Sequence, residues 1–137
     1  MKELVRYAME EGAHGLSSGL FYQPGRNAST EELIELCKVV AKYCGFYFTH
    51  VRDEGDVVIE AYKEAGRIAR EAGVQVNIAH QKAWDRANWG KVKQNLDIME
   101  NARSEGLEVS CDVYPYPYSN FLNLGHRLIS YTDCKNL

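Results

Sequence analysis

The sequence predicts an α/β fold in which about four parallel strands alternate with helices. Short apolar runs that end on a polar residue recur along the chain, and a helical pattern separates each run from the next. The runs end near Ser17, His50, His80 and Asp112, so their ends are roughly 30 residues apart, the length of one βαβ unit. This regular alternation favours parallel strands that are joined by crossover helices.

The first half of the chain supplies the first helix, strand and second helix. The apolar residues of segment 1–11 recur at helical spacing and predict a helix, and Gly12 is a signal for its end. Residues 13–20 are predicted to form a short strand of small residues that leads into a glycine-rich loop. The next helix begins with the pattern of a capping box, from Ser29 to Glu32.

The second half repeats the same alternation. Residues 46–50 and 74–80 are rich in β-branched and aromatic residues and are predicted strands that end on histidines. Apolar stripes at helical spacing predict helices from residue 57 to 72 and from 92 to 102. Residues 107–114 are the last predicted strand.

The predicted organisation is one partial barrel over residues 1–118, followed by an irregular tail over residues 119–137. A closed barrel needs eight βα units, whereas an open doubly wound sheet would have to cover both faces with few helices. Half of a barrel would leave two sheet edges unpaired, through which the chain can self-associate.

Composition excludes several classes of function. The net charge of −3 gives no electrostatic reason to expect nucleic acid or an anionic membrane as a partner. No apolar run approaches the roughly 18 residues of a membrane span, and the N-terminus has no apolar signal region. The four cysteines form no CxxC pair, so we expect reduced thiols in a cytoplasmic protein.

His50 and His80 are the main candidates for chemistry. Parallel strands end at one edge of their sheet, so the two imidazoles should converge there. Two neutral imidazoles suit zinc, which prefers nitrogen ligands and keeps an open position for water in catalytic sites. The alternative is a pair of hydrogen-bonded histidines at the rim of the sheet.

Other polar residues near the same predicted edge have more than one interpretation. Asp112 suits a metal ligand, a general base, a carboxylate that orients a histidine, or a loop cap. Lys82 and Arg52 suit binding of an anionic substrate, but both are equally compatible with a solvated surface position. Tyr114 lies in a proline-rich loop and either packs there or reaches substrate.

Several segments taken together resemble the N-acyl-D-amino-acid deacylase (D-aminoacylase) branch of the amidohydrolase superfamily. The resemblance runs in order from about residue 1 to residue 118, and each motif is weak by itself. The segments are Gly12–Leu20, Thr30–Leu33, Thr49–Glu54, Ile78–Lys82, Asn88–Val92 and Asp112–Tyr116.

The resemblance implies a metal-dependent (β/α)₈ barrel that hydrolyses the amide of an N-acyl-D-amino acid and holds one or two zinc ions. His50 and His80 match the family's metal-binding histidines, while Lys82 and Tyr114 match positions near the substrate pocket. The family's first-strand His-x-His, its upstream cysteine ligand and its late catalytic aspartate have no counterpart here. We therefore expect an internal fragment that is inactive alone.

Two other functions agree with the same patterns. One is a cyclic amidase or dihydroorotase-like enzyme of the same superfamily. The other is a half-barrel without catalytic function that serves as an interaction module. The substrate's acyl group and D-amino acid do not follow from the sequence.

Overall fold

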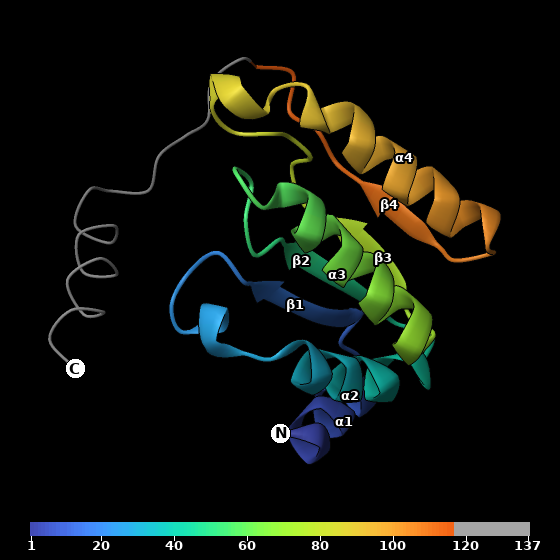
Figure 1. Cartoon of the computed structure of the whole chain (residues 1–137). Helices are drawn as coiled ribbons and strands as arrows, with labels where there is room; N and C mark the ends of the chain where they lie inside the picture. Colours follow the sequence, from blue (N-terminus) through green and yellow to red (C-terminus); the bar gives the residue numbers. More distant parts are fainter. Residues whose placement is uncertain (117–137) are drawn as a thin grey trace, which may run out of the picture.

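The computed structural model describes residues 1–116, in which helices and strands alternate from the N-terminus onward (Figure 1). The elements are α1 (Lys2–Glu10), β1 (Gly15–Gly19), α2 (Thr30–Ala41), β2 (Phe46–His50), α3 (Val58–Ala72), β3 (Gln75–Ile78), α4 (Lys91–Ser104) and β4 (Val109–Cys111), with short 3-10 turns η1 (Gly25–Asn27) and η2 (Arg86–Asn88). The predicted order of elements is confirmed. The predicted tail, residues 119–137, lies outside the described residues.

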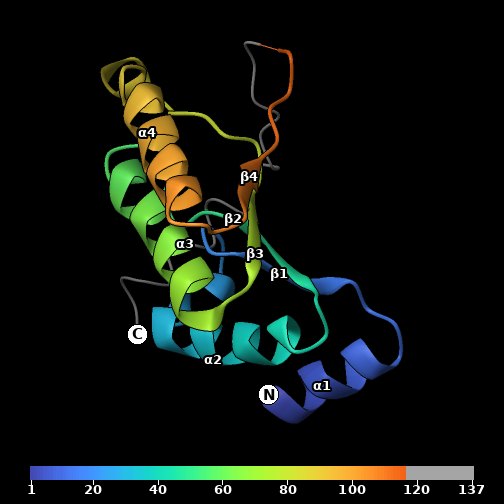
Figure 2. The same cartoon turned by 90° about the vertical axis from the view of Figure 1, so that its right-hand side faces the viewer.

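The four strands form one parallel sheet in chain order, β1-β2-β3-β4. Each strand thus pairs with the next strand along the chain, as expected for successive βα units of a barrel wall. The crossover helices α2, α3 and α4 lie on one side of this sheet (Figures 1 and 2). The prediction of parallel strands with crossover helices is confirmed.

The hydrophobic core lies between the sheet and these helices. Strand side chains alternate between faces, and Tyr47, Val76 and Ile78 are almost fully buried against the helical layer. Apolar residues of α2 and α3 supply the other half of the core, among them Val40, Ile68 and Ala69. This packing fixes the strands and therefore the loops that follow them.

The opposite face of the sheet carries a different row of residues. The strand register places Ser17, Phe48, Asn77 and Ser110 side by side across all four strands. Asn77 donates a hydrogen bond from Nδ2 to Ser110 Oγ over 3.0 Å. Within residues 1–116 no helix covers this face (Figure 2).

Two helix ends show how local sequence sets the element boundaries. Ser29 caps α2, because its hydroxyl oxygen accepts a hydrogen bond from the Glu32 backbone N–H at 3.1 Å. Gly73 ends α3 in the left-handed region, with φ of 64°, which glycine adopts without the cost of a Cβ clash.

Two strands are shorter than the sequence predicts. Strand β3 ends at Ile78 and β4 ends at Cys111, so His80 and Asp112 both lie just beyond their strands. The backbone N–H of His80 bonds to the Asp112 carboxylate at 2.6 Å, not to a neighbouring strand's carbonyl. His80 itself has φ of 37°, which no strand accommodates.

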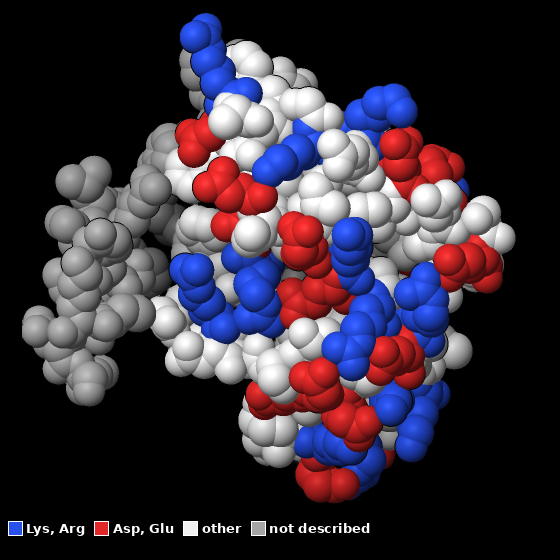
Figure 3. All heavy atoms as spheres, viewed as in Figure 1, with Lys and Arg blue, Asp and Glu red and all other residues white. Residues whose placement is uncertain are grey.

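The surface of the helical layer mixes both signs of charge (Figure 3). Arg67, for example, pairs with Glu31 at 3.0 Å and with Glu71 at 2.7 Å. Among residues 1–116, Cys37, Cys44 and Cys111 are free thiols. None of the described helices combines the length and the apolar character that a bilayer crossing would require.

Candidate metal centre

His50 is the last residue of β2, and its ring is packed among other rings at the end of the sheet. Ring centroids of Tyr22 and Phe21 lie 4.9 Å and 5.5 Å from that of His50. Nε2 is buried and forms no hydrogen bond with any described residue. Burial lowers the pKa of His50 to about 4, so the imidazole is neutral near pH 7 and keeps a free lone pair.

His80 reaches the same place from the loop after β3. The centroids of the two imidazole rings are 4.4 Å apart. The bond from the His80 backbone to Asp112 fixes the unusual turn that carries this ring. Asp112 therefore serves as a loop partner for His80, which is one of the interpretations that its sequence position allowed.

Glu54 is a site residue that the sequence reasoning did not select. Its side chain is only 9% exposed, and Oε1 lies 2.9 Å from His80 Nδ1 and 3.4 Å from His50 Nε2. The Glu54 carbonyl oxygen accepts a hydrogen bond from the Trp84 backbone N–H at 2.5 Å, which links the loops after β2 and β3. The available signal was its position four residues after His50 in a charged turn.

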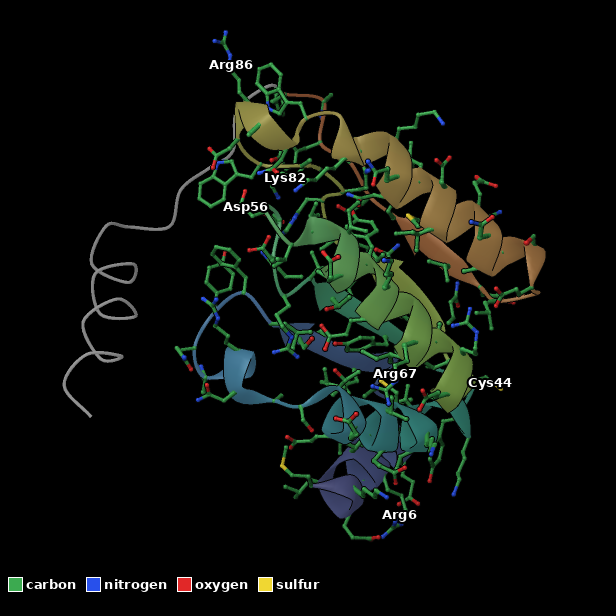
Figure 4. All side chains as sticks on the ribbon, in the orientation of Figure 1. Arg6, Cys44, Asp56, Arg67, Lys82 and Arg86 are labelled. Atoms are coloured by element: carbon green, nitrogen blue, oxygen red, sulfur yellow. The ribbon has the colours of Figure 1, made fainter. Side chains whose placement is uncertain are left out.

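Lys82 lies at the same end of the sheet, close to the loop that carries Asp56 (Figure 4). Its ammonium is 2.5 Å from Glu54 Oε1 and 2.9 Å from His80 Nδ1. The same ammonium stands 5.7 Å from the centroid of the Tyr114 ring. The structure therefore brings Lys82 and Tyr114 next to the two histidines, and their role in substrate binding stays a prediction.

Arg52 points to a different set of partners. Its Nε and Nη2 atoms lie 3.0 Å and 2.8 Å from the Glu64 carboxylate on α3. Nη1 and Nη2 also donate to the carbonyl oxygens of Arg26 and Ala28, at 2.8 Å and 2.9 Å. The guanidinium thus ties the η1 segment to α3, and its predicted contact with substrate stays a prediction.

The donor atoms at the sheet end suit a divalent metal ion. His50, Glu54 and His80 each offer one ligand atom, and all three atoms lie within 4.8 Å of one another. Imidazole nitrogen and carboxylate oxygen are ligands that zinc accepts. The buried and unbonded Nε2 of His50 is the clearest mark of a missing partner, because buried polar atoms are ordinarily hydrogen-bonded.

The curated proteins that are similar to this chain in sequence are named as deacylases or aminoacylases. D-aminoacylase of Alcaligenes xylosoxydans xylosoxydans is 42% identical over 85% of this chain, which corresponds to 24% of the relative. N-acyl-D-glutamate deacylase of the same organism is 36% identical over 98% of the chain and 28% of the relative. No family model matches the chain.

Solved structures give the same result for the fold. The N-acyl-D-glutamate deacylase of Bordetella bronchiseptica, crystallised with zinc and a phosphonate inhibitor, matches 85% of this chain and 24% of its own with a TM-score of 0.83 and 38% identity. A D-aminoacylase crystal structure matches with a TM-score of 0.77 and 40% identity, over 84% of this chain and 25% of its own.

A hydantoinase from Arthrobacter aurescens shares the fold with a TM-score of 0.64 at 19% identity, over 83% of this chain and 30% of its own. The sequence resemblance to deacylases is thus confirmed, as is the likeness to part of a barrel wall. The chain is a homologue of one segment of the D-aminoacylase and N-acyl-D-amino-acid deacylase family of amidohydrolases, and it spans about a quarter of the length of those relatives.

Proposed function

We propose that the chain carries the metal-binding histidines of an amidohydrolase that cleaves N-acyl-D-amino acids to a D-amino acid and a carboxylate. The observation that carries this proposal is the meeting of His50 and His80, with ring centroids 4.4 Å apart at the C-terminal end of parallel strands. Relatives that are named as deacylases of such substrates support the substrate class.

Zinc is the proposed cofactor, with one or two ions in the complete enzyme. His50 and His80 are the proposed ligands, because both present imidazole nitrogens at one site and Nε2 of His50 forms no hydrogen bond with a described residue. A bound zinc ion would lower the pKa of its water toward about 7 and polarise the amide carbonyl. Relatives have been crystallised with zinc and with a binuclear metal centre.

The chain's own residues would also bind the substrate. Lys82 and Tyr114 lie beside the histidines and are the proposed contacts for the substrate carboxylate. Arg52 is the third proposed contact and would first have to exchange its bonds to Glu64. We assign no general base within the chain, and the lack of one should slow hydrolysis by about 10²–10⁴-fold.

Neither alternative function has an observation in its favour. The likeness to hydantoinases, at 12–19% identity, concerns the fold alone, so it does not support a cyclic amidase or a dihydroorotase-like enzyme. A purely structural half-barrel gives no reason for a buried, unbonded imidazole nitrogen. For the compartment we propose the cytoplasm, because the described cysteines are free thiols.

The test of the proposed function is zinc binding by the chain and by two variants, His50→Asn and His80→Asn. Equilibrium dialysis with metal analysis should show zinc bound to the wild-type chain and a loss of about 10–100-fold in affinity in each variant. His14→Asn is the matched control, because His14 is exposed and lies far from the site in sequence. Unchanged affinity in both site variants would remove the assignment.

Activity is tested in a protein of the relatives' full length that carries this segment. The two variants should abolish hydrolysis of N-acyl-D-amino acids there, whereas His14→Asn should not. A panel of N-acyl-D-amino acids and cyclic imides separates the proposed enzyme from a cyclic amidase.

A further inference from the structure

One carboxylate oxygen stands at the centre of the candidate site. Oε1 of Glu54 is 2.5 Å from Lys82 Nζ and 2.9 Å from His80 Nδ1. Lys82 Nζ is also 2.9 Å from His80 Nδ1 and 3.4 Å from the His80 carbonyl oxygen. The ammonium therefore lies within 3.4 Å of three atoms that Glu54 and His80 supply.

The Glu54 carboxylate, which binds the Lys82 ammonium, belongs to the candidate metal centre together with His50 and His80. A zinc–oxygen bond of about 2.0–2.2 Å would need the same oxygen. Two cations this close would also repel each other strongly, since the site is shielded from water.

The position of Lys82 is fixed by burial as well as by charge. Only 21% of the Lys82 side chain and 9% of the Glu54 side chain are exposed. The hydrogen bond from the Trp84 backbone N–H to the Glu54 carbonyl oxygen holds the loop after β3 against the loop after β2. The ammonium is thus presented to His80 by the packing of two loops and is not a chance contact of a surface lysine.

We propose that Lys82 is an internal competitor for the metal ion, and that Glu54 is the positioning residue that holds it. The Lys82 ammonium is bonded to the Glu54 carboxylate, which is one of the candidate metal ligands. A metal ion held by Glu54 together with the two histidines would have to displace the ammonium. The inference rests on the proposed function only in taking His80 as a metal ligand.

The structure offers the displaced ammonium another contact. The Tyr114 ring centroid is 5.7 Å from Nζ already, within the range of a cation–π interaction. A lysine that leaves Glu54 also becomes available to an anionic ligand. Metal binding would thus be coupled to the release of the Lys82 ammonium from Glu54, which makes this ammonium available to substrate.

Metal titration of the full chain tests the competition. Cobalt absorption or calorimetry with zinc should give about tenfold tighter binding for Lys82→Met than for wild type. Lys82→Arg keeps the charge and should stay within about threefold of wild type. Lys38→Met, which removes an exposed lysine paired with Glu35 on α2, is the matched control and should change nothing.

A chemical readout follows the ammonium directly. Acetylation of Lys82, mapped by mass spectrometry, should rise about fivefold when zinc is added to wild type, while acetylation of Lys38 stays constant. Glu54→Gln should raise Lys82 acetylation in the absence of metal, because the anchor is gone. Circular dichroism checks that each variant is folded. If Lys82→Met does not fold, Lys82→Gln takes its place.

The outcomes separate this inference from the proposed function. Zinc binding that requires His50 and His80, with equal or weaker binding in Lys82→Met, overturns the competition alone. Unchanged Lys82 acetylation on addition of zinc has the same meaning. A wild-type chain without zinc affinity overturns both.

Discussion

At the scale of single residues, Arg52 is the best example of one side chain that joins two segments. Its guanidinium binds Glu64 on α3 through two nitrogens and donates to two carbonyl oxygens of the η1 segment. Thr30 donates a further hydrogen bond to the same Glu64 carboxylate at 2.7 Å. The planar guanidinium can satisfy all these acceptors at once, whereas an ammonium cannot.

We therefore expect Arg52→Lys to destabilise the fold. The variant loses the two-nitrogen contact with Glu64 and leaves carbonyl oxygens without their donor, which should lower the free energy of unfolding by about 1–3 kcal/mol. Urea unfolding followed by circular dichroism measures this. Lys63→Arg, an exposed exchange on α3, is the control. Equal stability of Arg52→Lys and wild type would contradict the structural role.

The cysteines give a second prediction at this scale. Cys37 is fully buried, and desolvation raises the pKa of its thiol to about 12. Since only the thiolate is nucleophilic, Cys37 should not react with iodoacetamide at pH 8 in the folded chain, whereas exposed Cys44 should (Figure 4). Peptide mapping reads each site separately. Labelling of Cys37 at the rate of Cys44 in the folded chain would contradict its burial.

The sequence predicted the two histidines at this scale but not their neighbours. The positions of His50 and His80 follow from the spacing of strand ends, which is a property of the backbone. Glu54 and Lys82 meet there because two loops are bonded through Trp84. Periodicity does not specify how loops fold, so this contact was beyond sequence reasoning.

At the scale of elements, β1 approaches β2 at Gly15 too closely to leave room for a side chain. A Cβ added at Gly15 would lie 2.0 Å from the carbonyl oxygen of Phe46, its register partner. Gly66 in α3 is buried, but an added Cβ there meets nothing within 4 Å. The same substitution by alanine should therefore have opposite effects at Gly15 and Gly66.

Gly15→Ala should lower the free energy of unfolding by about 1–3 kcal/mol, because the strands must separate locally. Gly66→Ala should raise it by up to about 1 kcal/mol, because alanine is the better helix former. Urea denaturation of both variants gives the comparison. If Gly15→Ala is as stable as wild type, the strand pairing described here is wrong.

Prediction of the elements from sequence succeeded where side-chain pattern decides the structure. Ser29 caps α2 as the capping-box pattern predicts, and α3 ends at Ala72, the predicted last residue. The predicted ends of β3 and β4 lie too late in the sequence. At β3 the reason is that the His80 backbone N–H donates to the Asp112 carboxylate and not to a carbonyl of the next strand. Hydrophobic periodicity does not indicate whether a backbone N–H bonds to a side chain or to a neighbouring strand.

At the scale of the whole molecule, β1 and β4 are the outer strands of the described sheet. Toward β3, the β4 segment uses the Glu108 carbonyl oxygen and the Asp112 N–H, so alternate residues such as Cys111 direct their backbone N–H outward. Exposed edges of this kind pair with other chains.

We propose that the chain self-associates through these edges, and sedimentation velocity tests this. The average sedimentation coefficient should rise with concentration, and Cys111→Pro should shift the association to higher concentration by removing an outward donor. Cys111→Ser keeps the donor and is the control. Monomers of wild type at all concentrations, up to about 100 μM, would contradict the proposal.

The order of the strands in space, which equals their order along the chain, has a consequence for biosynthesis. Each βα unit needs only its predecessor as a template, since every strand pairs with the one made just before it. A nascent polypeptide would present both imidazoles once β3 and the loop after it had emerged from the ribosome. Ion capture would then precede completion of the polypeptide and help to hold the early half together while the remainder is still being made.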